Sequence, residues 1–201
     1  MPEDQAPLAD SHLLERRIDG RTLLSGGFLD VRLDTVRLPD GNTATREYIQ
    51  HPGAVAIIAL LDDGDNPRLV LVRQYRYPVA KVLLEWPAGK LEVGEAQLAC
   101  AQRELREETG YSAREWAFAG EIHNAAAYSS ESIWLWFARG LQPGAVNPDE
   151  GEFVETVSLR LQDLQAVDAR GELLDVKTLV GLRWLQECLA GRRQWAWQSA
   201  A

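Results

Sequence analysis

The chain has 201 residues, of which 46% are hydrophobic and 25% are charged, and its formal net charge is −9. This composition is typical of a folded globular protein and excludes disordered, collagen-like and coiled-coil chains. The length favours one domain, or one domain with a small appendage. Nucleic acids and anionic membranes are polyanions, so we expect this acidic chain to bind neither.

The cysteines and the first residues bear on the compartment. Cys100 and Cys188 are too few for a disulfide framework, and unpaired thiols suit a reducing environment. No apolar run reaches the ~18–20 residues of a membrane span. Residues 1–17 carry mixed charge and lack the apolar core of a signal peptide. We therefore expect a cytoplasmic protein.

The first part of the chain predicts two β-hairpins. Residues 1–17 are expected to form a lead-in with a short helix at its end. Residues 27–50 alternate apolar and polar side chains around the turn sequence at 39–42, which is typical of a hairpin. Residues 54–61 and 69–75 predict the second hairpin. The run at 54–61 is apolar on both faces, which indicates a central strand buried from both sides.

The rest of the chain mixes helices and strands. Residues 95–108 contain neither Gly nor Pro, which predicts a helix that ends at Gly110. The remaining pattern predicts strands at 82–86, 116–122, 133–138 and 153–159, and helices at 163–167 and 175–189. Together these elements indicate a mixed α/β fold, with residues 1–50 as an N-terminal β segment and residues 51–201 as the main domain.

Three carboxylates share one side of the predicted helix. With Glu104 at zero on a helical wheel, Glu107 falls at about −60° and Glu108 at about +40°. Like charges at this spacing repel, so folding alone gains nothing from them. A hard divalent cation reverses the sign, because Mg²⁺ prefers oxygen ligands. On these residues alone, an acidic surface balanced by Arg103 and Arg106 is the alternative interpretation.

The wider spacing around these carboxylates resembles the signature of the Nudix hydrolases. It is written G-x5-E-x7-R-E-U-x-E-E-x-G-U, where U is a bulky apolar or aromatic residue, and it runs over residues 89–111. The matching positions are Gly89, Glu95, Arg103, Glu104, Leu105, Glu107, Glu108, Gly110 and Tyr111. The resemblance implies an α/β/α sandwich with a mixed sheet from about residue 50 onward, and cleavage of a nucleoside diphosphate linked to another group.

The same resemblance implies a role for each matching residue. Arg103 is expected to belong to the catalytic set and to orient the glutamates by charge-assisted hydrogen bonds. Mg²⁺, with Mn²⁺ as an alternative ion, is expected to be held by the main-chain carbonyl of Ala88 and by Glu104, Glu107 and Glu108. Glu95 is expected to be a further metal ligand or a hydrogen-bond acceptor behind the ligands.

Residues around this signature narrow the substrate. Residues 74–78 and 84–89 resemble the ADP-ribose pyrophosphatase branch of the family. That resemblance implies that Arg76 and Arg46 contact phosphate or base and that Phe28 stacks on the adenine. It also implies a homodimer formed through the N-terminal β segment, and cleavage of ADP-ribose or a related nucleotide sugar to a nucleoside monophosphate and a sugar phosphate.

Two further segments carry expected site residues. The branch takes its general base from an acidic loop, for which Glu152 is the first choice here and Glu150 the second. Glu131 is expected near the metal and substrate, in a segment where relatives often carry a proline. Alanines stand at positions 125 and 126 instead, which makes a wider range of nucleoside diphosphate sugars plausible, GDP-mannose included.

Two other functions remain open at this point. One is hydrolysis of another pyrophosphate, such as NADH or a dinucleoside polyphosphate. The other is a nucleotide-sugar sensor that has kept the fold without catalysis. A sensor has no need for three crowded carboxylates, so intact Glu104, Glu107 and Glu108 favour an enzyme.

Overall fold

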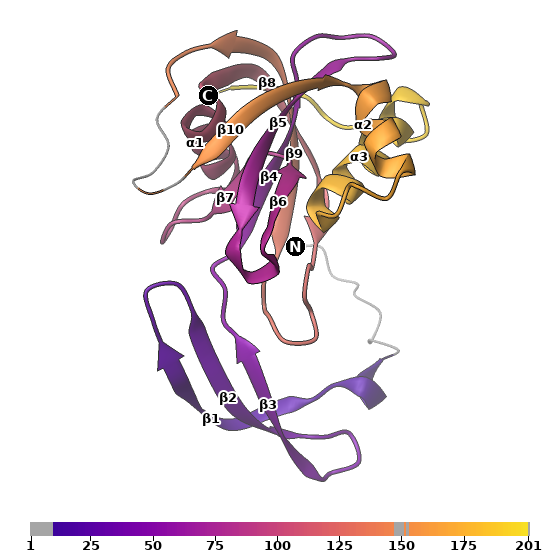
Figure 1. Ribbon diagram of the computed structural model, residues 1–201. Helices are drawn as coiled ribbons and strands as arrows, with labels where there is room; N and C mark the ends of the chain where they lie inside the picture. The colour runs from indigo at the N-terminus through magenta and orange to yellow at the C-terminus, as the bar shows by residue number, and fades with distance from the viewer. Residues whose placement is uncertain (1–9, 147–150, 152, 201) are drawn as a thin grey trace. The chain divides into compact units, whose positions relative to one another are not determined.

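The computed structural model describes residues 10–146, 151 and 153–200. It divides into two compact units (Figure 1). The first contains the described residues up to His51 together with Ala125–Glu131. The second contains Pro52–Asn124 and the described residues from Ser132 onward.

The first unit is a three-stranded antiparallel sheet in the order β1-β2-β3. The predicted hairpin at 27–50 corresponds to β2 and β3, which pair from Val31 with Ile49 to Arg37 with Thr43. In the loop at 125–131, Ser130 N donates to Ile49 O at 2.9 Å. The elements of this unit are η1 (Ser11–Leu13), β1 (Arg16–Ser25), β2 (Asp30–Arg37) and β3 (Thr43–Ile49).

Strand β1 was not predicted, and its burial explains why. Nine of its ten residues are exposed, and Gly20 alone is half-buried. A strand without a buried face has no apolar alternation for a sequence pattern to detect. It is held by backbone pairing with β2, from Arg16 with Arg37 to Ser25 with Asp30.

The second unit is built on a mixed sheet in the order β10-β5-β4-β9-β8-β11, with β6 beside β5 and β7 beside β4. Strand β4 pairs in parallel with β9 and antiparallel with β5, so it lies in the interior of the sheet, as its apolar sequence predicts. The strands are β4 (Ala54–Leu60), β5 (Arg68–Arg76), β6 (Lys81–Glu85), β7 (Ala88–Lys90), β8 (Tyr111–Ile122), β9 (Ile133–Pro143), β10 (Val154–Arg160) and β11 (Gln198–Ser199), with the short helix η2 (Tyr77–Val79) between β5 and β6.

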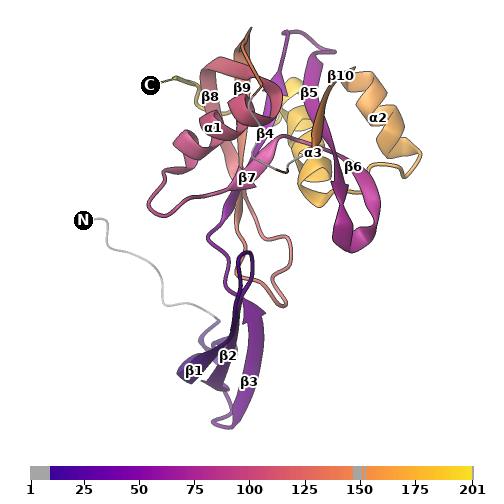
Figure 2. The same cartoon turned by 60° about the vertical axis from the view of Figure 1, so that its left-hand side comes forward.

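Helices cover both faces of this sheet (Figure 2). Helix α1 (Gln97–Thr109) lies on one face, and α2 (Leu161–Ala169) and α3 (Val176–Leu189) lie on the other. The side chains of β4 alternate between the two layers: Val55 and Ile57 pack in the core on the α1 side, and Ile58 packs in the core on the other side. The predicted α/β sandwich with an N-terminal β appendage is confirmed.

Helix α1 begins two residues later than predicted. Glu95 lies in a turn ahead of the helix, where its backbone N–H donates to Glu92 O at 3.1 Å and its side chain accepts from Glu92 N at 3.0 Å. The predicted end at Gly110 is correct, and this glycine adopts the left-handed conformation at φ 73°. Within the described part of the chain, no helix is both long enough and apolar enough to cross a membrane.

Candidate active site

The site lies on the outer side of α1. The inner side of the helix is apolar, with Cys100, Ala101 and Leu105 fully buried against the sheet. This packing fixes the rotation of the helix, so the positions between these residues face outward. Burial also raises the pKa of the Cys100 thiol, which donates to the Lys90 carbonyl, so this cysteine is a core residue.

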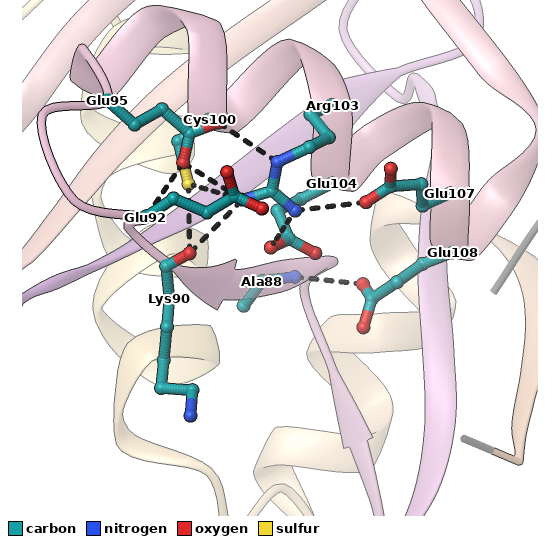
Figure 3. Close-up of polar contacts among 9 residues, drawn as sticks. All are labelled: Ala88, Lys90, Glu92, Glu95, Cys100, Arg103, Glu104, Glu107 and Glu108. Atoms are coloured by element: carbon teal, nitrogen blue, oxygen red, sulfur yellow. Dashed lines mark hydrogen bonds and ion pairs between the residues drawn. The ribbon is translucent and has the colours of Figure 1, made fainter. Parts of the chain in front are cut away.

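Arg103 is the centre of the polar contacts on the outer side (Figure 3). Its guanidinium donates to Glu95 through Nε at 2.9 Å and through Nη2 at 3.0 Å. Its Nη1 donates to Glu104 at 2.7 Å and to Glu107 at 2.9 Å. Nη2 also donates to the main-chain carbonyl of Lys90 at 3.1 Å. One cation therefore holds three carboxylates and the end of strand β7.

These contacts determine the charge of Glu95. The hydrogen bonds from Arg103 lower the pKa of the Glu95 carboxyl to about 2, and the Glu92 amide acts in the same direction. The bond to Glu95, with those to Glu104 and Glu107, raises the pKa of Arg103. Arg103 and Glu95 are therefore both charged near neutral pH.

Glu108 is held differently. It is 3% exposed, and its Oε2 accepts from the main-chain N–H of Ala88 at 2.9 Å. Its own main-chain carbonyl accepts from the Thr156 hydroxyl at 3.0 Å. A buried carboxylate needs such partners, because burial without them carries a large desolvation cost. Glu104, Glu107 and Glu108 form the carboxylate ridge of α1. The Ala88 amide fixes the one carboxylate of this ridge that Arg103 does not contact in the bonds described here.

Gly89 makes room for Glu104. A Cβ at position 89 would lie 1.9 Å from Cδ and Oε1 of Glu104. A side chain at that position would therefore displace the carboxylate. The first glycine of the signature is required here by the close approach of the glutamate, since no positive φ is involved.

The chemistry of the donors suits a hard divalent cation, since Glu104, Glu107 and Glu108 offer carboxylate oxygens within about one turn of helix. Among the described residues, however, no three His, Cys, Asp or Glu side chains form a ready-made metal-binding group. Two of the carboxylates turn toward Arg103, and Glu108 turns toward Ala88 (Figure 3). The ridge therefore supplies the right ligand type, and the metal roles stay predictions.

The residues expected to bind substrate lie in both units. In the second, Arg76 donates to Glu85 through Nε and Nη2, both at 2.8 Å. In the first, Arg46 donates to Glu15 at 2.9 Å and Phe28 is 69% exposed. Their roles stay predictions.

The remaining expected residues are Glu131 and the two candidates for the general base. The carboxylate of Glu131 lies 3.7 Å from Nε2 of His51, and both belong to the first unit. Glu150 and Glu152 lie outside the described residues. The assignments of all three stay predictions.

Sequence reasoning missed the support behind this site. Thr178 and Lys177, at the start of α3, contact the end of β6 just before Ala88. The sequence does carry a signal for the start of that helix. Asp175 stands at its N-cap, where its side chain accepts from Thr178 N at 2.9 Å. The partner of Thr178 could not be predicted, because no local pattern reports a contact 92 residues away.

The comparisons with known families match both parts of the chain. Residues 50–178 match the model of the NUDIX domain. Residues 15–49 match the model described as the nucleoside diphosphate sugar hydrolase N-terminal domain.

Individual relatives match over most of their length. The chain is 37% identical over 174 residues to the methanol dehydrogenase activator of Bacillus methanolicus, covering 86% of this chain and 92% of that one. It is 36% identical over 177 residues to the ADP-ribose pyrophosphatase of Bacillus subtilis, covering 87% and 94%. A crystal structure of an ADP compounds hydrolase superposes with a TM-score of 0.76 over 90% of this chain and 97% of that chain, at 22% identity, and shows the shared fold.

Proposed function

Because the chain belongs to the Nudix family, we propose that it hydrolyses the pyrophosphate bond of ADP-ribose or a related nucleoside diphosphate sugar with Mg²⁺, giving a nucleoside monophosphate and a sugar phosphate. The observation that carries this proposal is the ridge of α1, where Arg103 holds Glu104 and Glu107 beside the buried Glu108. Proteins of this family generally depend on divalent metal ions.

The choice of substrate rests on the relatives. The match to an ADP-ribose pyrophosphatase extends over nearly the whole of that protein. The N-terminal segment matches a family named for nucleoside diphosphate sugar hydrolases. The methanol dehydrogenase activator has a comparable identity. Overall identity therefore does not select the sugar, and the substrate must be tested with a panel.

The contacts support a role for each residue of the ridge. A bound divalent ion would neutralise pyrophosphate charge and lower the pKa of a water molecule. Glu104, Glu107, Glu108 and the Ala88 carbonyl would hold it, with Glu95 as a further acceptor. Arg103 keeps the carboxylates together against their mutual repulsion, and the Ala88 amide orients Glu108.

Substrate and proton transfer are assigned to other segments. We assign general base catalysis to Glu152, with Glu150 as the alternative. Arg76, Arg46 and Phe28 would contact phosphate or base, and Glu131 would lie near the substrate. A homodimer formed through residues 1–50 would bring the first unit of one subunit to the site of the other.

A panel of nucleotide sugars tests the proposal. ADP-ribose, GDP-mannose, NADH and a dinucleoside polyphosphate are incubated with Mg²⁺, and the products are separated after reaction in ¹⁸O-labelled water. We expect the nucleotide sugars to be cleaved, EDTA to stop the reaction and added Mg²⁺ to restore it. Turnover that persists without metal, or cleavage of none of these compounds, would contradict the proposal.

A further inference from the structure

The first turn of helix α3 contacts the chain segment that leads into the site. We propose that Thr178 is a positioning residue of the metal site, acting through the main chain of Trp86 on the Ala88 amide that holds Glu108. The inference rests on the proposed function. The side-chain hydrogen bonds of Thr178 among the described residues are to Trp86 and Asp175, so any effect on the carboxylates is indirect.

Thr178 makes two hydrogen bonds to Trp86. The Trp86 main-chain N–H donates to the Thr178 hydroxyl at 3.0 Å, and the indole Nε1–H donates to the Thr178 carbonyl at 3.2 Å. Both residues are fully buried. A Cβ on Gly181, one turn later, would lie 2.3 Å from the Trp86 Nε1, so the indole is seated closely against the helix. Trp86 is thus held at its backbone and at its side chain.

The Thr178 hydroxyl is itself held in one orientation. It donates to Oδ2 of Asp175 at 2.5 Å, and the Thr178 main-chain N–H donates to the same oxygen at 2.9 Å. Because the hydroxyl proton is committed to Asp175, its oxygen is directed to accept from Trp86. The preceding residue strengthens the same junction, since Lys177 contacts both Asp175 and the buried Glu85. Side chains of α3 therefore hold two consecutive residues at the end of β6.

One residue separates Trp86 from the site. Pro87 has a fixed φ, and its carbonyl accepts from Ile57 N at 2.8 Å in the central strand. Ala88 follows, and its N–H donates to Glu108 at 2.9 Å. A shift of the Trp86 backbone would therefore reach the Ala88 amide through a stiff link. The Thr178 hydroxyl is placed to set the position of that donor.

The test measures binding of Mg²⁺ alone, by calorimetry, to the full chain without substrate. Thr178→Val preserves the shape of the side chain and removes the hydroxyl, and Thr178→Ser keeps the hydroxyl. We expect Thr178→Val to weaken Mg²⁺ binding about tenfold, the lower range for a residue that supports metal ligands indirectly. Thr178→Ser should bind Mg²⁺ like the wild type. Should the valine variant not fold, Thr178→Ala removes the same hydroxyl and takes its place.

A second variant separates positioning from general stability. Leu164→Ala removes a fully buried side chain of α2 in the core on the same face of the sheet. It should lose stability, measured by urea unfolding, without weakening Mg²⁺ binding. Unchanged binding in the hydroxyl-deleted variant, or equal weakening in Leu164→Ala, would overturn the positioning role.

The wild type separates this role from the proposed function. Wild-type chain that binds Mg²⁺ but cleaves no nucleotide sugar would overturn the function, while the variants would still decide the role of Thr178. The proposed function would stand if the wild-type chain cleaves the substrate. If the Thr178→Val variant then binds Mg²⁺ normally, the positioning role alone would be overturned. A wild-type chain that cleaves nucleotide sugars but binds no Mg²⁺ on its own would overturn the positioning role and leave the proposed function standing.

Discussion

The space beside Gly89 offers a sharp test of the site. An alanine Cβ there would lie 1.9 Å from Cδ of Glu104, whereas ordinary contacts begin at 3.4 Å. The carboxylate must therefore retreat by about 1.5 Å, the difference between these distances. It is the end of a flexible side chain, so the backbone can stay in place while the carboxylate leaves its 2.7 Å contact with Arg103.

This displacement predicts a large loss of activity and a small loss of stability. A misplacement of ~1 Å at a reacting site can cost about 100-fold in rate, so we expect Gly89→Ala to lower kcat/KM by at least that factor. The lost ion pair is partly exposed, so the free energy of unfolding should fall by only about 1 kcal/mol.

The assay compares kcat/KM for ADP-ribose at saturating Mg²⁺ with stability from urea unfolding. Gly64→Ala is the matched control, because its Cβ meets open space while its φ of 110° makes alanine strained. It should lose stability and keep its activity. If Glu104 mediates the effect, Gly89→Ala should add little to a Glu104→Gln variant. Wild-type kcat/KM in Gly89→Ala would refute the reasoning.

Three further predictions follow from the contacts. Glu107→Gln should lower kcat by about 100-fold or more while the chain stays folded, because it removes a charged oxygen expected at the metal; turnover and circular dichroism check this. The lowered pKa of Glu95 means that its contribution to stability is complete above its ordinary pKa of 4.5 and is lost as pH falls toward 2. Urea unfolding should therefore show the wild type more stable than Glu95→Gln by about 1–2 kcal/mol near neutral pH, after a discount for solvent screening, with the difference vanishing across that range. Arg76→Ala should raise the KM for ADP-ribose about tenfold. It should also lower stability, because the buried carboxylate of Glu85, which is 1% exposed, loses the two hydrogen bonds from Arg76 and keeps Lys177 as its other charged partner.

Each of these has a contrary result. Near-normal turnover in Glu107→Gln would remove that residue from the site. A stability difference for Glu95→Gln that does not change between neutral pH and pH 2 would show that the Arg103 contact does not set its charge. An unchanged KM in Arg76→Ala, with reduced stability, would make Arg76 a partner of Glu85 only.

Local periodicity predicted those elements that bury an apolar face. The helix over 97–109 and the central strand over 54–60 both do so, and both were predicted within two residues. Strands β7 and β11 have three and two residues, too short for any alternation to be counted. The loop at 125–131 joins the first unit through backbone bonds to Ile49, which side-chain patterns do not report. The missed elements are therefore those held mainly by pairing.

Family resemblance added what periodicity left open. The helical wheel placed Glu104, Glu107 and Glu108 on one side of the helix. That arrangement alone did not distinguish a metal site from an ordinary acidic surface. The match over residues 50–178 confirms the family that the signature indicated. Identification of the family did not, however, reveal which atoms hold each carboxylate, because Glu95 lies outside the helix and Ala88 on a separate strand.

The carboxylates are held in two different ways, and this explains why only part of the site could be predicted from the sequence. Arg103 adjoins Glu104 in sequence and lies one turn from Glu107, so the spacing that crowds the charges also supplies their counter-ion. Glu108 is buried and depends on an amide 20 residues earlier in the chain. That amide lies two residues after Trp86, which Thr178 of α3 holds at the end of β6. The first arrangement is a property of one helix; the second exists only once the sheet and both helical layers have assembled.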